Sequence, residues 1–257
     1  MIVVKNKASI QKMEEAGDRL AMLFRELNEI VKPGISTLAI NEWVEARLGQ
    51  LDLVSRMKGY MGYRYVSCIS INDEVVHGMP SSSTKVQDGD FVKIDICASW
   101  RGYCADMARA FFVGSVSDDA RKLAQVAQQA LDKGIEKVRP GNRLTDISAA
   151  IQQEVERHGF GVVRDFAGHG IGKQMHEDPE ILNYGKPGQG PVLQRGMAFA
   201  LEPMITFGNY NVHVTGDGWT VKTDDKSLAA HVEDTVIVTD GEPKVVTRGK
   251  KPQSGLK

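Results

Sequence analysis

The sequence lacks several features that would place it in a specialised class of protein. Its three cysteines, Cys68, Cys97 and Cys104, are odd in number and show no CxxC spacing, which argues against a disulfide framework and for a reducing compartment. No apolar run approaches the length of a membrane span, and the N-terminus has no signal-peptide core. The formal net charge is only -1, without a block of one sign, so nucleic-acid binding is not expected. We therefore expect a soluble, cytoplasmic globular protein.

A faint internal repeat divides the chain into two halves. Val31-Lys32-Pro33-Gly34 is echoed 107 positions later by Val138-Arg139-Pro140-Gly141. Each copy follows an expected helix, over 13–31 and 118–138, and precedes a second expected helix with apolar residues on one face. The candidate N-caps of these second helices are Ser36, Thr37 and Thr145.

A β-rich stretch follows each helical pair. The expected strands cover 65–71, 90–98 and 105–113 in the first half, and 197–207, 212–214, 229–239 and 244–247 in the second. Arg101-Gly102 and Asp240-Gly241 are hairpin signals that indicate antiparallel pairing. The pattern predicts an α+β fold, with one sheet built from two similar halves, about 13–113 and 118–247, and helices on one face. We expect a single domain over 1–247 and a basic, flexible tail over 248–257.

Residues 168–179, GHGIGKQMHEDP, hold two of the six histidines on a glycine-rich backbone. The segment has too much glycine for a helix and shows no strand alternation, so it is predicted to be a loop. His169 and His176 lie seven positions apart within it.

Four carboxylates lie where buried strands should be apolar: Asp95, Asp106, Glu202 and Glu233. Buried acids are unfavourable unless they are paired, and the nearby basic residues are too few to neutralise them. If Trp100-Arg101 forms a two-residue turn, Asp95 lies directly opposite Asp106, whereas a longer loop ending at Gly102 needs a bulge. Two divalent cations would balance the four charges, with His169 as a neutral ligand.

Several motifs together resemble the type I methionine aminopeptidases. They are residues 70–80 (SINDEVVHGMP), 168–172 (GHGIG), 175–177 (MHE), 201–204 (LEPM) and 232–235 (VEDT), with Asp95 and Asp106. The similarity runs from about residue 5 to about residue 247. It implies the pita-bread fold, in which two pseudo-symmetric halves surround a curved, largely antiparallel sheet covered by helices. It also implies that the protein is a monomer that removes the initiator methionine from nascent polypeptides. Substrates with a small second residue would be preferred. Whether the tail contacts a ribosome is left open.

The resemblance also implies roles for individual residues. Asp95 would chelate one of two divalent ions (Co, Mn, Fe or Zn), His169 the other, and Asp106 and Glu233 would bridge them. Glu202 would bind the second ion and take a proton from a bridging water. As further catalytic residues, His176 would donate to the scissile carbonyl and His77 would contact the scissile amide. The methionine pocket would be lined by Tyr60, Tyr63, Cys68, His77, Met175 and Trp219.

The chain departs from the family pattern near the pocket and at a monovalent-cation site. Val76, Met57, Met175 and His231 replace residue types that are common in relatives, and Ala229 replaces a serine that helps to hold the cation. Asn72, another contributor to that site, is retained, so the cation is left open. The alternatives are a proline-specific peptidase of the same fold and a non-catalytic peptide-binding relative. The proline peptidases carry an extra N-terminal domain, for which the early first helix leaves no room, and the binding relatives have lost metal ligands.

Overall fold

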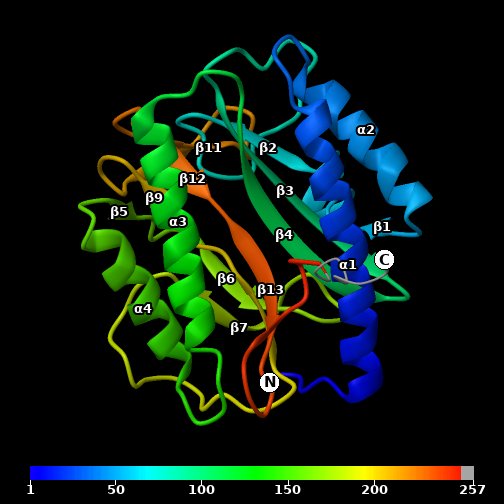
Figure 1. Cartoon of the computed structure of the whole chain (residues 1–257), viewed down its shortest axis with the longest axis vertical. Helices are drawn as coiled ribbons and strands as arrows, with labels where there is room; N and C mark the ends of the chain where they lie inside the picture. Colours follow the sequence, from blue (N-terminus) through cyan, green and yellow to red (C-terminus); the bar gives the residue numbers. More distant parts are fainter. Residues whose placement is uncertain (250–257) are drawn as a thin grey trace, which may run out of the picture.

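Two pairs of helices pack against the sheet in the computed structural model, which describes residues 1–249 (Figure 1). The first pair is α1 (Lys7–Ile30) and α2 (Thr37–Gln50), and the second is α3 (Asp118–Glu136) and α4 (Leu144–Glu156). Helix α1 packs on β3 and β4, and α3 packs on β8, β9, β12 and β13. The apolar stripes of these amphipathic helices form two buried clusters with the sheet, one in each half.

A nine-stranded antiparallel sheet contains strands from both halves of the chain. Its main path runs β1-β3-β4-β13-β8-β6-β7, with β2 beside β3 and β14 beside β13. The strands are β1 (Val54–Ser55), β2 (Cys68–Ile71), β3 (Phe91–Trp100), β4 (Tyr103–Phe112), β6 (Ala167–Gly170), β7 (Glu177–Leu182), β8 (Ala198–Leu201), β13 (Glu233–Ile237) and β14 (Lys244–Val245). The predicted α+β class is therefore confirmed.

Two smaller sheets and a short 3₁₀ helix complete the described part of the chain. One sheet has the order β12-β9-β5 and the other pairs β10 with β11. The bounds are β5 (Gly161–Val162), β9 (Met204–Thr206), β10 (Val212–Val214), β11 (Val221–Thr223), β12 (Ala229–His231) and the 3₁₀ helix Tyr60–Gly62. Residues 1–249 contain no helix long and apolar enough to cross a membrane.

The internal repeat is a structural repeat. Gly34 and Gly141 both have a φ near +90°, and each donates its N–H to a residue 52 positions later, Val86 and Leu193, respectively. These two acceptors are again 107 positions apart. The same offset relates the first residues of the strands β3 and β8, so it extends into the sheet that carries the candidate site.

One predicted helix cap is confirmed and another is wrong. The side chain of Ser36 caps α2 by accepting a hydrogen bond from the Ala39 N–H at 3.1 Å. The N-cap of α4 is Arg143 rather than Thr145, and the Asp146 carboxylate accepts from the Arg143 N–H at 2.8 Å. The Thr145 hydroxyl instead accepts from the Gln189 N–H, because Thr145 already lies inside the helix.

Two predicted strands of the second half are each divided between two sheets. The stretch expected over 197–207 breaks at Glu202-Pro203 into β8 and β9, since proline lacks the N–H that a ladder requires. The stretch expected over 229–239 breaks at Val232 into β12 and β13. Both breaks place an acidic residue where the chain passes between the two sheets: Glu202 where it leaves the large sheet for the small one, and Glu233 where it returns to the large one.

The predicted tail falls partly outside the described residues. Arg248, its first residue, pairs with Asp234 at 2.7 Å and with Asp132 at 2.5 Å, so the chain is tied to β13 and α3 at this point. Residues 250–257 lie outside the described range.

Candidate metal centre and substrate pocket

Five neighbouring strands each bring one predicted metal ligand to the same region. The order β3-β4-β13-β8-β6 is continuous in the large sheet. The corresponding side chains are Asp95 on β3, Asp106 on β4, Glu233 at the start of β13, Glu202 directly after β8 and His169 on β6. Asp95 and Glu202 are also 107 positions apart, so these two acids occupy equivalent places in the two halves.

The predicted pairing of Asp95 opposite Asp106 is wrong by two residues. The β3–β4 turn consists of Arg101 and Gly102, with φ values of +48° and +78°, so Asp95 pairs with Ala108 and Asp106 with Cys97. Positive φ at both central positions is the geometry of a tight hairpin, which favours glycine. A shift of two residues keeps both carboxylates on one face, and the strands need no bulge.

His169 lies on a strand, which corrects the expectation that residues 168–179 form a loop. It belongs to β6, with a register irregularity between His169 and Gly170 against β7. A Cβ on Gly168 would lie 2.4 Å from the Ala200 carbonyl oxygen of β8, and one on Gly170 would lie 2.0 Å from that of Asp178. Glycine at these two positions therefore lets β6 lie between β7 and β8.

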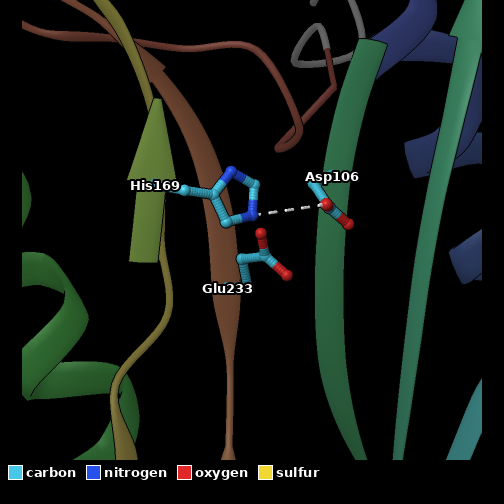
Figure 2. Close-up of side chains that lie close together, drawn as sticks. All are labelled: Asp106, His169 and Glu233. Carbon is cyan, nitrogen blue, oxygen red and sulfur yellow. Dashed lines mark ion pairs between the residues drawn. The ribbon is translucent and has the colours of Figure 1, made fainter. Parts of the chain in front are cut away.

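Three candidate ligands lie close together in Figure 2: one atom each of Asp106, His169 and Glu233 lies within 4.8 Å of the others. The Nε2 atom of His169 lies 3.9 Å from Asp106 Oδ2 and 3.4 Å from Glu202 Oε1. Asp95 lies close enough to Asp106 for the Asp106 carboxyl group to raise the pKa of Asp95 beyond the effect of burial.

Burial and the closeness of like charges determine the protonation states of this cluster. Burial raises the pKa of Asp106 to about 6 and raises the pKa values of Asp95, Glu202 and Glu233, which the neighbouring acids raise further. Burial lowers the pKa of His169 to about 3, so its ring is neutral and Nε2 can offer a lone pair. Glu233 Oε1 is buried without a hydrogen-bond partner among residues 1–249. Carboxylates and a neutral imidazole form a donor set that fits divalent metal ions.

A cavity of about 240 Å³ opens next to the cluster and brings together every predicted site residue. Its lining contains the five candidate ligands, the two further histidines His77 and His176, and the expected pocket residues Tyr60, Tyr63, Cys68, Met175 and Trp219. Met57, Met61 and Cys97 also line it. Of these, Met61 and Cys97 were not predicted as site residues; Cys97 could have been recognised as a neighbour of the acids, because it lies two positions after Asp95.

His176 lies at the mouth of the cavity, beside the ring of His169. The centroids of the two rings are 4.3 Å apart and their planes are perpendicular. The Nδ1 atom of His176 is 2.7 Å from the Tyr60 hydroxyl. If that hydroxyl donates, the ring carries its proton on Nε2, and burial lowers the pKa of His176 so that the neutral form is favoured.

Aromatic rings form the other wall of the cavity. Tyr63 and Trp219 make an edge-to-face contact with centroids 4.9 Å apart, and His77 lies 6.5 Å from the Trp219 ring. The Tyr63 hydroxyl donates to the Ser67 carbonyl at 3.0 Å, which satisfies its polar end within the protein. Burial lowers the pKa of His77 to about 4.

Comparison with known proteins matches residues 11–240 to Metallopeptidase family M24. The chain belongs to the M24 metallopeptidases. It is 45% identical to a methionine aminopeptidase of Clostridium acetobutylicum over 96% of this chain and 99% of that protein, and 42% identical to methionine aminopeptidase 1 of Bacillus subtilis over 96% and 100%. The crystal structure of a methionine aminopeptidase from Thermotoga maritima covers 96% of this chain and is itself covered completely, with a TM-score of 0.94 and 40% identity. The pita-bread fold is thus confirmed, and membership of the family implies use of divalent metal.

Two further buried polar residues of this M24 metallopeptidase, His231 and Lys93, lie near the candidate ligands. His231 Nε2 is 3.8 Å from Glu202 Oε2 and has no hydrogen-bond partner among the described residues. Burial lowers the pKa of His231 to about 3. The sequence indicated His231 only as a departure from the family pattern, and Lys93, a fully buried lysine near it, was not singled out.

Proposed function

We propose that this chain hydrolyses the peptide bond after an N-terminal methionine, releasing free methionine and a polypeptide shortened by one residue. The observation that carries the proposal is the cavity in which five candidate metal ligands meet a small, largely apolar and aromatic pocket. The close relatives named methionine aminopeptidase support the same reaction. The proposal also includes a site for two metal ions and a role for each of the residues around it.

We assign two divalent ions to the five ligands. Asp95 would hold one ion, His169 and Glu202 the other, and Asp106 and Glu233 would bridge them. When bound, such ions supply Lewis acidity that polarises a carbonyl and lowers the pKa of a coordinated water. The four carboxylates balance the charge of two divalent ions, which accounts for so many acids in a buried position.

Glu202 would act as the general base. Its carboxylate lies at the end of β8, and its Oε1 faces His169 at 3.4 Å. Burial and the neighbouring acids raise its pKa, so this carboxylate is a better proton acceptor than an exposed glutamate. It would hold the proton taken from the attacking water and deliver it to the leaving nitrogen.

His176 and His77 would stabilise and orient the substrate. His176, with its Nδ1 facing Tyr60, would use Nε2–H to donate to the oxygen of the scissile carbonyl, where negative charge grows during attack. His77, half-buried and neutral, would contact the scissile amide. Both rings line the cavity beside the acids.

The apolar wall would select methionine. Tyr63, Trp219, Met175 and Cys68 line the cavity, and a thioether packs well on ring edges and on other sulfur-containing side chains. Small second residues such as Gly, Ala or Ser are the expected preference. We place the reaction on the N-termini of nascent polypeptides in the cytoplasm, by a monomer; three buried cysteines without a disulfide support a reducing compartment.

Methionine release from the peptide Met-Ala-Ser tests this function. The metal-free protein is supplied with Mn, Co, Fe or Zn in separate reactions, and Leu-Ala-Ser is the matched control peptide. We expect release from the first peptide with at least one metal and little from the second. A strict requirement for proline at the second position would favour the proline-specific peptidase, and binding without release under all conditions would favour the non-catalytic relative.

A further inference from the structure

Lys93 is a fully buried basic residue that takes no part in the reaction outlined above. Its relative exposure is 1%, and it lies on β3 two positions before Asp95. Alternate residues of a strand point to the same face, so its side chain lies on the same face of the sheet as that candidate ligand. Burying an ammonium group is strongly unfavourable unless partners compensate it.

The partners of the Lys93 amine are those of a cation. Its Nζ donates to the backbone carbonyl of Asn72 at 2.9 Å and lies 5.1 Å from the centroid of the Phe91 ring. Burial lowers the pKa of Lys93 to about 7; three carboxylates oppose this shift and favour the charged amine, while Lys222 adds to it. The carboxylates belong to Asp73, Glu74 and Asp90.

Asn72 is a junction between three strands. Its carbonyl oxygen also accepts from the Ala229 N–H of β12 at 3.1 Å, so both lone pairs of that oxygen are used. Its side chain bridges Asp90, at 2.8 Å, and the Phe91 N–H at the start of β3, at 2.9 Å. Asn72 directly follows β2 and has a φ of +52°, a left-handed conformation that needs this support.

The junction connects directly to the candidate site. The segment that starts at Asn72 ends at His77, which also has a left-handed φ, of +58°, and whose ring lines the cavity. Strand β12, held by the Asn72 carbonyl, ends at His231, two residues before Glu233. A shift of Asn72 would therefore displace a substrate-contacting ring and the strand that leads to a candidate ligand.

We propose that the Lys93 amine is a tethered cation, which occupies the position of a free monovalent cation at the Asn72 carbonyl and thereby positions the segment that carries His77. The proposal rests on the function given above and adds a positioning residue to it. Because the cation is covalently attached, the native protein needs no sodium or potassium at this place.

Chemical rescue tests the proposal. Lys93→Ala removes the amine and leaves space, whereas Lys93→Met removes the amine and fills the space; Lys122→Met, at an exposed lysine, is the control for a lost charge. We expect kcat to fall on the order of 10-fold to 100-fold in both Lys93 variants, the size caused by small misplacement of catalytic groups. Potassium, ammonium or methylammonium should restore part of kcat in Lys93→Ala only, whereas tetramethylammonium, which is too large, should not.

Thermal denaturation provides a readout that does not depend on activity. The midpoint of Lys93→Ala should rise with potassium or ammonium at constant ionic strength, and that of the native protein should not. If the kcat and the denaturation midpoint of the native protein depend on potassium, the proposal is overturned, even if no Lys93 variant folds. It is also overturned if neither Lys93 variant responds to any specific ion. A native protein that releases no methionine contradicts the proposed function, while the thermal data still decide the role of Lys93.

Discussion

His169 and His176 have contacting rings but different surroundings. The Nε2 atom of His169 faces the carboxylates of Asp106 and Glu202, whereas Nδ1 of His176 faces the Tyr60 hydroxyl at the cavity mouth. A neutral imidazole surrounded by acids suits a metal ligand, and one held by a phenol next to open space suits a hydrogen-bond donor to substrate. Removing the ring of His169 should therefore have a different effect on the protein from removing the ring of His176.

We predict that His169→Ala loses bound metal, whereas His176→Ala keeps it. In His176→Ala, kcat should fall roughly 100-fold, as expected when one donor to a developing negative charge is removed. Elemental analysis of the purified variants and methionine release from Met-Ala-Ser measure the two effects. A metal-free His176→Ala protein would contradict the role given to this ring.

Metal binding should weaken as the pH falls. Burial raises the pKa of Asp106 to about 6, so below this pH the metal-free carboxyl holds a proton that metal must displace. His169, whose pKa is lowered to about 3, stays neutral in this range and adds no pH dependence. We expect the apparent affinity for Mn to fall roughly tenfold per pH unit for each proton displaced, measured by calorimetric titration.

Asp106→Asn is the control for this pH dependence. The variant should bind Mn more weakly and show a shallower dependence on pH, because one displaced proton is gone. An unchanged slope would assign the pH dependence to other groups of the cluster.

At the scale of the elements, the sequence predicted which segments form helices and strands better than how the strands pair. The helices were recognisable from their apolar periodicity and from Ser36. The β3–β4 register was not, because Trp100-Arg101 and Arg101-Gly102 both offered two-residue turns, and only the positive φ at Gly102 decides between them. The glycines around His169 predict a loop, whereas the structure has a strand there; these glycines allow close contact with the neighbouring backbones.

The two glycines inside helices α1 and α2 should respond oppositely to replacement by alanine. A Cβ on Gly17 of α1 would lie 2.1 Å from the Val246 carbonyl oxygen, whereas a Cβ on Gly49 of α2 would meet nothing within 4 Å. Alanine favours a helix interior over glycine by about 1 kcal/mol. We therefore expect Gly49→Ala to raise the free energy of unfolding by up to about 1 kcal/mol.

Gly17→Ala should instead lower the free energy of unfolding, because the chain segment after β14 must move away from α1. The expected loss is about 1–3 kcal/mol, as for overpacked positions. Urea unfolding of the two variants gives both values. A stabilised Gly17→Ala protein would show that the segment at Val246 moves away from α1 without cost.

At the scale of the whole molecule, the internal repeat accounts for where the candidate site lies. Asp95 and Glu202 occupy equivalent positions of the two halves, and the strands β4 and β13 between them contribute Asp106 and Glu233. The sequence could identify all of these ligands, since acids in apolar strands are costly without a counter-charge. It could not identify the contacts that join the halves behind the site, because these depend on the order of the strands in the sheet.

A buried ionic network joins the two halves on the side of β13 opposite Glu233. Asp234, fully buried, accepts hydrogen bonds from Arg109 of β4 at 2.5 Å and from Arg248 at 2.7 Å. Arg109 also donates to the Glu233 carbonyl, and Arg248 contacts Asp132 of α3. The network thus ties strands of both halves to the segment that follows β14.

Arg109→Met should destabilise the protein far more than Arg139→Met. The first change removes a partner from a carboxylate with no exposure, and breaking such a buried pair costs about 3–5 kcal/mol; we expect about 3 kcal/mol, because Arg248 still contacts Asp234. Arg139 pairs with Glu242 at the surface, where their side chains are 40% and 81% exposed, and such a pair contributes about 0–1 kcal/mol. Urea unfolding measures both losses, and equal losses would show that the network behind the site does not hold the two halves together.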